Sequence, residues 1–226
     1  VMLSGPAGSG KELAARYIHA NSARASAPFV TVGCASIAPE RMEEVLFGRE
    51  SDESGVVPGL LEEANGGVIY FDEVADMPMG TKIQVDLRVI SSTSRDLEAE
   101  IAAERFRREL FHRLNVVPIA VPSLEERRED IPALAEHFIA MFHKTQGLAL
   151  RSLSEEAAAL LQTMRWPGNV RQLRNMIERV LILGEGQGPI AARELPSESS
   201  GPVDEGRVVL SGAIATMPLR EAREAF

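Results

Sequence analysis

The first twelve residues constrain the fold of this chain more than any other segment. An apolar stretch, residues 1–4, runs into a glycine-rich loop that ends in Gly10 and Lys11, and apolar residues at helical spacing follow from Leu13. Glycines let the backbone turn tightly enough for several N–H groups to point at one phosphate, and the N-terminus of the following helix adds positive potential there. The sequence therefore predicts a strand–loop–helix unit that binds a nucleoside triphosphate, with Lys11 reaching its outer phosphates.

We expect the nucleotide-binding residues to be those of the loop itself: Gly5, Pro6, Ala7, Gly8, Ser9, Gly10, Lys11 and Glu12. In the general pattern a Ser or Thr that helps to hold Mg²⁺ follows the lysine, whereas Glu12 stands here. Either the metal is held in another way or the loop is less competent than its glycines indicate. The alternative interpretation is an ordinary turn rich in Gly and Ser, and the flanking strand and helix patterns argue against it.

The second chemical signal is an acidic pair at the end of an apolar run. Residues 68–71 are all apolar or aromatic, which suits a strand buried on both faces of a parallel sheet. Asp72 and Glu73 follow at the carboxyl end, where open α/β sheets bind their ligands. In nucleotide hydrolases such an Asp holds Mg²⁺, and the neighbouring Glu orients and deprotonates the attacking water. The alternative is an acidic turn without a chemical role.

Composition narrows the class of protein. The chain has 226 residues, of which 45% are hydrophobic, and its formal net charge is -9. This acidic balance argues against a nucleic-acid-binding surface within the chain. Cys34 is the single cysteine, so no internal disulfide can form, which fits a cytoplasmic protein, and we expect Cys34 in the core. No apolar run is long enough to span a membrane, and an opening in mid-strand indicates a fragment of a longer protein.

The pattern along the chain indicates two kinds of domain. Up to Pro122, expected strands at 29–32, 68–72, 87–94 and 116–121 alternate with helices at 39–45 and 60–64, which predicts a parallel sheet. The last of these strands is expected to be buried, and the acidic, glycine-bearing residues 49–59 to be a loop.

After Pro122 helical spacing takes over. Apolar residues recur at helical spacing in 131–142 and 170–181, and Ser152 with Glu155 forms a candidate capping box between them. From Gly184 the chain is rich in Gly, Pro, Ser and Glu and reads as linker. We therefore expect three parts: a nucleotide-binding core (1–122), a helical domain (123–184) and a linker (185–226).

Several further motifs occur in one order along the chain. They are Leu-Phe-Gly at 46–48, Tyr-Phe-Asp-Glu-Val-Ala-Asp-Met-Pro at 70–78, the arginine-rich segment 105–114, and Trp-Pro-Gly-Asn-Val-Arg-Gln-Leu at 166–173. Together with the glycine-rich loop they resemble the central AAA+ ATPase domain of NtrC-class bacterial enhancer-binding response regulators. Segments 91–101 and 218–224 are most similar to the NtrX branch. The resemblance implies an α/β fold with a P-loop parallel sheet flanked by helices, followed by a small all-helical lid.

The resemblance also assigns roles to single residues. It implies that Glu is usual at position 12, that Lys11 binds phosphate, that Asp72 holds Mg²⁺ and that Glu73 activates water. It also implies that Thr93 and Ser94 sense the γ-phosphate. Arg107 and Arg113 would be fingers that reach the nucleotide of the neighbouring subunit, and Arg171 would be a second sensor on the lid. An arginine at a γ-phosphate neutralises charge that develops in the transition state. Without the resemblance, each arginine would be read as part of a solvated helix surface.

Three departures from the family pattern affect the expected function. Activators of this family carry a Gly-Ala-Phe-Thr-Gly-Ala loop that contacts the alternative sigma factor, and residues 49–59 contain nothing like it, as in other NtrX-like members. Gly33 stands where the family has an Asn that restrains the catalytic Glu, so the coupling of nucleotide state to Glu73 is in doubt. Segment 79–84 is far shorter than the family's helix and hairpin-sized insertion, so either this protein has lost them or the sequence closes over a missing, mobile segment.

Three functions therefore compete. The first is a ring-forming ATPase motor that remodels RNA polymerase. The second is a regulatory module that binds ATP and Mg²⁺, has weak or oligomerisation-dependent hydrolysis and makes no direct contact with the sigma factor. The third, a small-molecule kinase, leaves the arginines unexplained. We favour the second. The expected partners are further copies of the chain, and RNA polymerase or its sigma factor is a candidate. The resemblance also implies contact with a sensor kinase through a receiver domain and with DNA through a helix-turn-helix domain, and neither domain lies in this chain. No membrane contact is expected.

Overall fold

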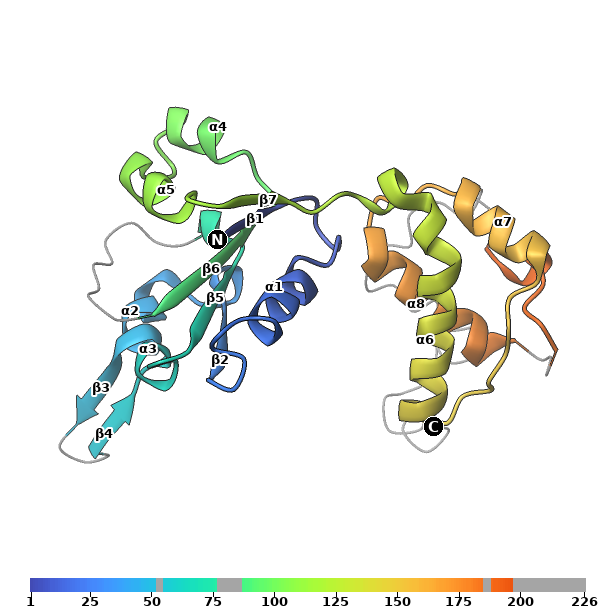
Figure 1. Ribbon diagram of the computed structural model, residues 1–226, viewed down its shortest axis with the longest axis horizontal. Coiled ribbons are helices and arrows are strands. Elements are labelled where there is room, and N and C mark those ends of the chain that lie inside the picture. The colour runs from blue at the N-terminus through green and yellow to red at the C-terminus, as the bar shows by residue number, and fades with distance from the viewer. Residues whose placement is uncertain (52–54, 77–86, 185–187, 197–226) are drawn as a thin grey trace, which may run out of the picture.

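The computed structural model describes residues 1–51, 55–76, 87–184 and 188–196 of the chain, in two lobes (Figure 1). The first lobe is built on a five-stranded sheet in the order β2-β5-β6-β1-β7, in which every pair is parallel. Its strands are β1 (Met2–Ser4), β2 (Phe29–Gly33), β5 (Val68–Asp72), β6 (Arg88–Thr93) and β7 (Pro118–Ala120). This confirms the predicted α/β fold, since strands joined by helical crossovers form parallel sheets.

Helices cover both faces of the sheet because successive side chains of a strand point to opposite faces. On one face, Leu3, Tyr70 and Ile90 pack with α1 (Lys11–Ala20). On the other face, Met2, Ile69 and Phe71 belong to a core that includes residues of four helices. These are α2 (Pro39–Phe47), α3 (Leu60–Glu63), α4 (Leu97–Ala102) and α5 (Arg108–Leu114).

Two expectations about this lobe are wrong. Residues 49–59 are not a simple loop, because β3 (Gly48–Ser51) and β4 (Gly55–Pro58) pair as an antiparallel hairpin. The strand expected at 116–121 is not buried: β7 lies at the edge of the sheet, with Val117 and Ile119 49% and 38% exposed. Its apolar residues resemble a buried strand in sequence, but only β1 covers it on one side.

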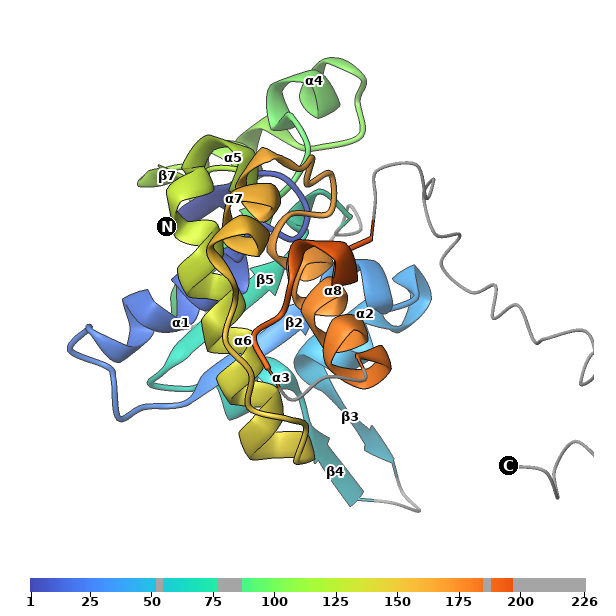
Figure 2. The ribbon, with the colours of Figure 1, turned by 90° about the vertical axis from the view of Figure 1, so that its right-hand side faces the viewer.

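The second lobe is a helical lid. It contains α6 (Ile131–Gln146), α7 (Glu155–Thr163) and α8 (Asn169–Leu183), with 3₁₀ segments at Leu124–Asp130 and Ala192–Glu194. Figure 2 shows α6 and α8 side by side in front of the sheet, and their apolar faces enclose the buried Trp166. No helix among the described residues is long and apolar enough to cross a membrane.

Two details of the lid correct the sequence interpretation. The N-cap of α7 is Ser154, whose hydroxyl accepts a hydrogen bond from the N–H of Ala157 at 3.1 Å, in place of the expected Ser152. Residues 188–196, expected to be linker by composition, pack onto the lid: Ile190 bridges to Leu153, and Glu194 pairs with the buried Arg151 at 2.8 Å. The boundaries of the three predicted parts stay predictions.

Candidate functional site

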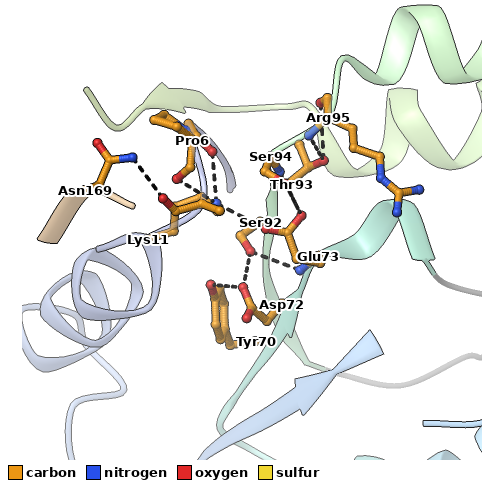
Figure 3. A network of polar contacts seen from close by, with 12 residues as sticks. Pro6, Lys11, Tyr70, Asp72, Glu73, Ser92, Thr93, Ser94, Arg95 and Asn169 are labelled. Carbon is orange, nitrogen blue, oxygen red and sulfur yellow. Dashed lines mark hydrogen bonds and ion pairs between the residues drawn. The ribbon is translucent and has the colours of Figure 1, made fainter. Parts of the chain in front are cut away.

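The glycine-rich loop lies between the end of β1 and the start of α1 (Figure 3). Gly10 caps α1 with a left-handed φ of 100°, which only glycine adopts readily. Lys11 is the first residue of α1 and is 6% exposed. Its Nζ donates to the carbonyl oxygens of Gly5 at 2.9 Å and Pro6 at 3.3 Å, so the loop curls around a buried positive charge.

The acidic pair lies on the adjacent part of the same sheet edge. Asp72 is the last residue of β5, and its Oδ1 accepts hydrogen bonds from the hydroxyls of Tyr70 at 2.9 Å and Ser92 at 2.6 Å. Burial raises the pKa of the Tyr70 phenol above its ordinary value, so this hydroxyl keeps its proton and acts as a donor. Two neutral donors thus orient the carboxylate of Asp72 without neutralising its charge.

Glu73 is held from two sides. One oxygen, Oε1, lies 3.2 Å from Nζ of Lys11. The other, Oε2, accepts hydrogen bonds from the backbone N–H of Ser94 at 2.8 Å and from its hydroxyl at 2.9 Å. Glu73 has a φ of 52°, a conformation that non-glycine residues adopt at a cost and that is enriched at functional sites.

The strand order explains why these residues meet. Residues at the carboxyl ends of β1, β5 and β6 lie together because these strands are neighbours in the sheet, with Phe71 opposite Ser91 and Ser4 opposite Thr93. Gly33 lies opposite Asp72 in the register of β2 and β5. A Cβ placed on Gly33 would lie 3.3 Å from the hydroxyl of Ser36, which would have to move by a few tenths of an ångström to admit a side chain.

The structure separates the two residues predicted as a γ-phosphate sensor. Thr93 is buried, and its hydroxyl donates to the carbonyl of Arg95 and accepts from the N–H of Arg95, which fixes the turn after β6. Ser94, the next residue, is exposed and contacts Glu73. Thr93 therefore shapes the turn, while Ser94 reaches the acidic pair.

The predicted arginines all lie at the surface. Arg107 occupies the N-cap position of α5 and Arg113 lies in its last turn, and both are exposed, with no side-chain hydrogen bond or ion pair to any described residue. Arg171 is exposed in the first turn of α8. Its Cβ would lie 3.3 Å from a Cβ placed on Gly8. Glu12 pairs with Arg16 at 2.7 Å on the outer surface of α1. Arg171 is thus next to the loop, and the arginines of α5 are free to meet another molecule.

Residues not singled out from the sequence complete the site. Tyr70 and Ser92 orient Asp72, and Asn169 at the start of α8 donates from Nδ2 to the carbonyl of Ala7 at 2.9 Å. The signal for Ser92 was present, since it lies in a strand that ends in a run of hydroxyl residues. The contact of Asn169 joins residues 162 positions apart, which no local pattern reveals.

These residues fit a nucleotide with its magnesium ion. Lys11 is a buried cation whose carboxylate partner is 23% exposed, and the hydroxyl of Ser9 is buried with no hydrogen-bond partner among the described residues. No group of three or more His, Cys, Asp or Glu within the described ranges could hold a metal alone. This donor set suits an ion held by one protein carboxylate together with phosphate oxygens and water, which is how Mg²⁺ is usually bound beside nucleotides.

Comparison with family models and known proteins agrees with this geometry. Residues 1–83 and 80–120 match a sigma-54 interaction domain, and residues 125–207 match an AAA+ ATPase lid domain. The two parts of the first match meet at residues 80–83, within the predicted short segment 79–84, which lies outside the described residues.

Curated relatives match all or nearly all of the chain. The nitrogen assimilation regulatory protein NtrX of Azorhizobium caulinodans is 49% identical over 254 residues, which span 100% of this chain and 55% of that protein. The transcriptional regulatory protein ZraR of Escherichia coli K12 is 42% identical over 92% of this chain and 52% of its own length. The chain therefore spans about half the length of the curated relatives it matches.

Solved structures show the same architecture. NtrX of Brucella abortus in complex with ATP is 47% identical, with a TM-score of 0.78, and the match covers 100% of this chain and 54% of that one. The same protein in complex with ADP is 47% identical with a TM-score of 0.79, covering 99% of this chain and 55% of that one.

Proposed function

This chain belongs to the sigma-54 interaction family of AAA+ domains from NtrC-class response regulators, most like the NtrX branch, and we propose that it binds ATP and Mg²⁺ and hydrolyses ATP only weakly or on oligomerisation. The observation that carries this proposal is the meeting of Lys11, Asp72 and Glu73 at the carboxyl ends of neighbouring strands. These are the phosphate-binding cation, the metal-binding carboxylate and the base that phosphoryl transfer to water requires.

Each residue has a defined task in this proposal. The loop and Lys11 bind the phosphates, while the hydroxyls of Tyr70 and Ser92 orient the carboxylate of Asp72, which would hold the metal. A bound Mg²⁺ ion would neutralise charge on the phosphate oxygens. Glu73 accepts a proton from the attacking water once its carboxylate is free of Lys11.

Weak hydrolysis follows from how Glu73 is held. Both of its oxygens are engaged, one by a buried cation and the other by two donors of Ser94, so neither oxygen is free to accept a proton from a water molecule. Gly33 offers no side chain that could compete for the carboxylate. Release of Glu73 thus depends on a rearrangement of Lys11 or Ser94.

Dependence on oligomerisation follows from the exposed arginines of α5. The side chains of Arg107 and Arg113 are exposed and form no ion pair with any described residue, and we propose that they reach the nucleotide of a neighbouring copy. An arginine supplied in trans is worth several orders of magnitude in turnover in related phosphoryl-transfer systems. The same exposed arginines would also serve the alternative function, a fully competent ring-forming motor.

The partners of the parent protein are proposed from the relatives. The segment 49–59, most of which belongs to the paired strands β3 and β4, lacks the Gly-Ala-Phe-Thr-Gly-Ala motif, so we propose no direct contact with the alternative sigma factor. The relatives extend well beyond the matched region. A receiver domain addressed by a sensor kinase and a DNA-binding domain are proposed for the parent protein.

Calorimetry with ATP and Mg²⁺, combined with phosphate release, tests the proposal. The chain is expected to bind ATP and to release phosphate slowly, and Lys11→Ala is expected to lose binding while keeping a cooperative unfolding transition. Lack of ATP binding by the unaltered chain would overturn the proposal, and so would transfer of the γ-phosphate to a small molecule.

A further inference from the structure

Three successive carbonyl groups of the glycine-rich loop accept hydrogen bonds from the second lobe. The carbonyl of Ala7 accepts from Nδ2 of Asn169 at 2.9 Å, that of Gly8 from the N–H of Val170 at 3.0 Å, and that of Ser9 from a guanidinium nitrogen of Arg127 at 2.7 Å. The donors come from the start of α8 and from the 3₁₀ segment that leads into α6. The lid therefore packs against the glycine-rich loop and holds three of its carbonyl groups in place.

Fixing these carbonyls also fixes the N–H groups of the loop. In a trans peptide the C=O of one residue and the N–H of the next lie in one plane and point in opposite directions. With the carbonyls of Ala7 and Ser9 turned toward the lid, the N–H groups of Gly8 and Gly10 point away from it. The N–H of Ser9 stays within the loop, donating to the carbonyl of Pro6 at 3.2 Å. Such converging N–H groups bind anions.

Among these three donors, Asn169 is the one whose side chain hydrogen-bonds both to the loop and to the connection between the lobes. It is 3% exposed and has a φ of 52°, a left-handed conformation that Asn adopts at lower cost than most residues. Its Oδ1 accepts from the N–H of Leu124 at 2.8 Å, while its Nδ2 donates to Ala7. One buried amide thus joins α8, the connection between the lobes and the phosphate-binding loop.

Close packing makes this contact sensitive to the position of the lid. A Cβ placed on Gly8 would lie 2.5 Å from the carbonyl oxygen of Gly168, so the loop and the start of α8 touch directly. A rotation of the lid would separate Asn169 from Ala7 and Val170 from Gly8 together, because both donors belong to α8.

We propose that Asn169 is a positioning residue that sets the phosphate-binding loop from the lid, so that nucleotide affinity depends on the amide of this side chain. The inference rests on the proposed nucleotide-binding function. It assigns to the side chain of Asn169 a role separate from that of the exposed Arg171, which is the next residue but one along α8.

The test compares Asn169→Asp with the unaltered chain. Asp has nearly the same shape and still accepts from the N–H of Leu124, but it cannot donate to the carbonyl of Ala7. We expect the Kd for ADP to rise by at least about tenfold, since one hydrogen bond is lost and two acceptors face each other. The amide resonances of Gly8 and Gly10 in ¹⁵N–¹H spectra recorded without nucleotide are expected to shift.

Two further variants keep the result interpretable. Gln172→Ala removes the contact between Oε1 of Gln172 and the N–H of Gly168 at 2.9 Å, which disturbs the start of α8 without touching the loop, and it should keep the Kd for ADP. Asn169→Gly adopts the left-handed φ without cost and places no carboxylate beside the carbonyl of Ala7, although it also loses the bond to Leu124, and it should weaken ADP binding as well.

The outcomes separate this inference from the proposed function. A folded Asn169→Asp or Asn169→Gly protein with an unchanged Kd and unchanged glycine resonances would overturn the positioning role while leaving nucleotide binding intact. Failure of the unaltered chain to bind ADP or ATP would overturn both. Equal weakening in Gln172→Ala would show that the start of α8, and not the side chain of Asn169, sets the affinity.

Discussion

Ser94 holds the carboxylate of Glu73 with two hydrogen bonds, one from its backbone N–H at 2.8 Å and one from its hydroxyl at 2.9 Å. Ser94 follows β6, and Gly33 ends β2 on the other side of β5. The family resemblance implies a restraining Asn at position 33. We propose that Ser94 supplies the restraint on Glu73 in this chain.

Ser94→Ala tests whether this contact limits hydrolysis. The substitution removes the hydroxyl and leaves the backbone N–H, so the carboxylate loses one of two charge-assisted hydrogen bonds. Such a bond contributes about 1.5–3 kcal/mol, and release of part of it should raise turnover by up to roughly tenfold. Steady-state phosphate release measures the effect. A fall in turnover would instead assign the Ser94 hydroxyl to the γ-phosphate, as the family resemblance implies.

Glu73→Gln separates binding from chemistry. The amide cannot accept the proton of the attacking water, so we expect phosphate release to fall by about 10²-fold or more. ATP binding should persist, because Lys11 loses its ion-pair partner at 3.2 Å and becomes available to phosphate. Calorimetry and phosphate release measure the two properties. Loss of ATP binding in a folded Glu73→Gln protein would contradict this assignment.

Gly8→Ala and Gly10→Ala form a matched pair in the glycine-rich loop. Both residues have a left-handed φ, of 74° and 100°, which costs an alanine about 1–2 kcal/mol. Only at Gly8 would the added methyl group meet the lid, 2.5 Å from the carbonyl oxygen of Gly168. We expect Gly8→Ala to lower the free energy of unfolding further than Gly10→Ala, as measured by urea titration. Equal losses would mean that the lobes do not pack closely at the loop.

Acid stability should depend on Glu194. Hydrogen bonds from Arg151, and then from the N–H of Ala191, lower the pKa of Glu194 to about 2 from its ordinary 4.5. Because the folded state binds the proton less tightly than the unfolded state, the stabilisation is complete above about pH 4.5 and is lost as the pH falls toward 2. The difference in melting temperature between the unaltered chain and Glu194→Gln should therefore be largest near pH 7 and vanish near pH 2. A difference independent of pH would refute this linkage.

Local patterns predicted the parts of the molecule that local chemistry determines. The glycine-rich loop, the buried β5 and the position of Asp72 at its end follow from residue order alone. The burial of Cys34 follows as well: this residue is 2% exposed, and burial, followed by the charges of Asp72 and Asp76, raises the pKa of its thiol to about 12. The edge position of β7 did not follow, because an apolar run carries no record of how many strands flank it.

Long-range contacts explain what the sequence left out of the site. The order of strands brings Ser92 to Asp72 and Ser94 to Glu73 across about twenty residues, and the lid brings Asn169 to Ala7. The consequence of Gly33 could not be predicted from the sequence for the same reason. A residue that is distant in sequence, here Ser94, can contact Glu73 where Gly33 has no side chain to do so. The pairing of Arg151 with Glu194 likewise turned an expected linker into part of the lid.

Steady-state ATP hydrolysis as a function of protein concentration, with Lys11→Ala as the inactive control, decides whether turnover depends on association of copies. We expect ATP binding at all concentrations, and a turnover per chain that is low in dilute solution and rises as copies associate, if Arg107 and Arg113 act on a neighbouring nucleotide as proposed. Replacing Arg113 with Ala should abolish the rise and keep the binding. High turnover per chain that is independent of concentration would refute the proposed dependence on oligomerisation.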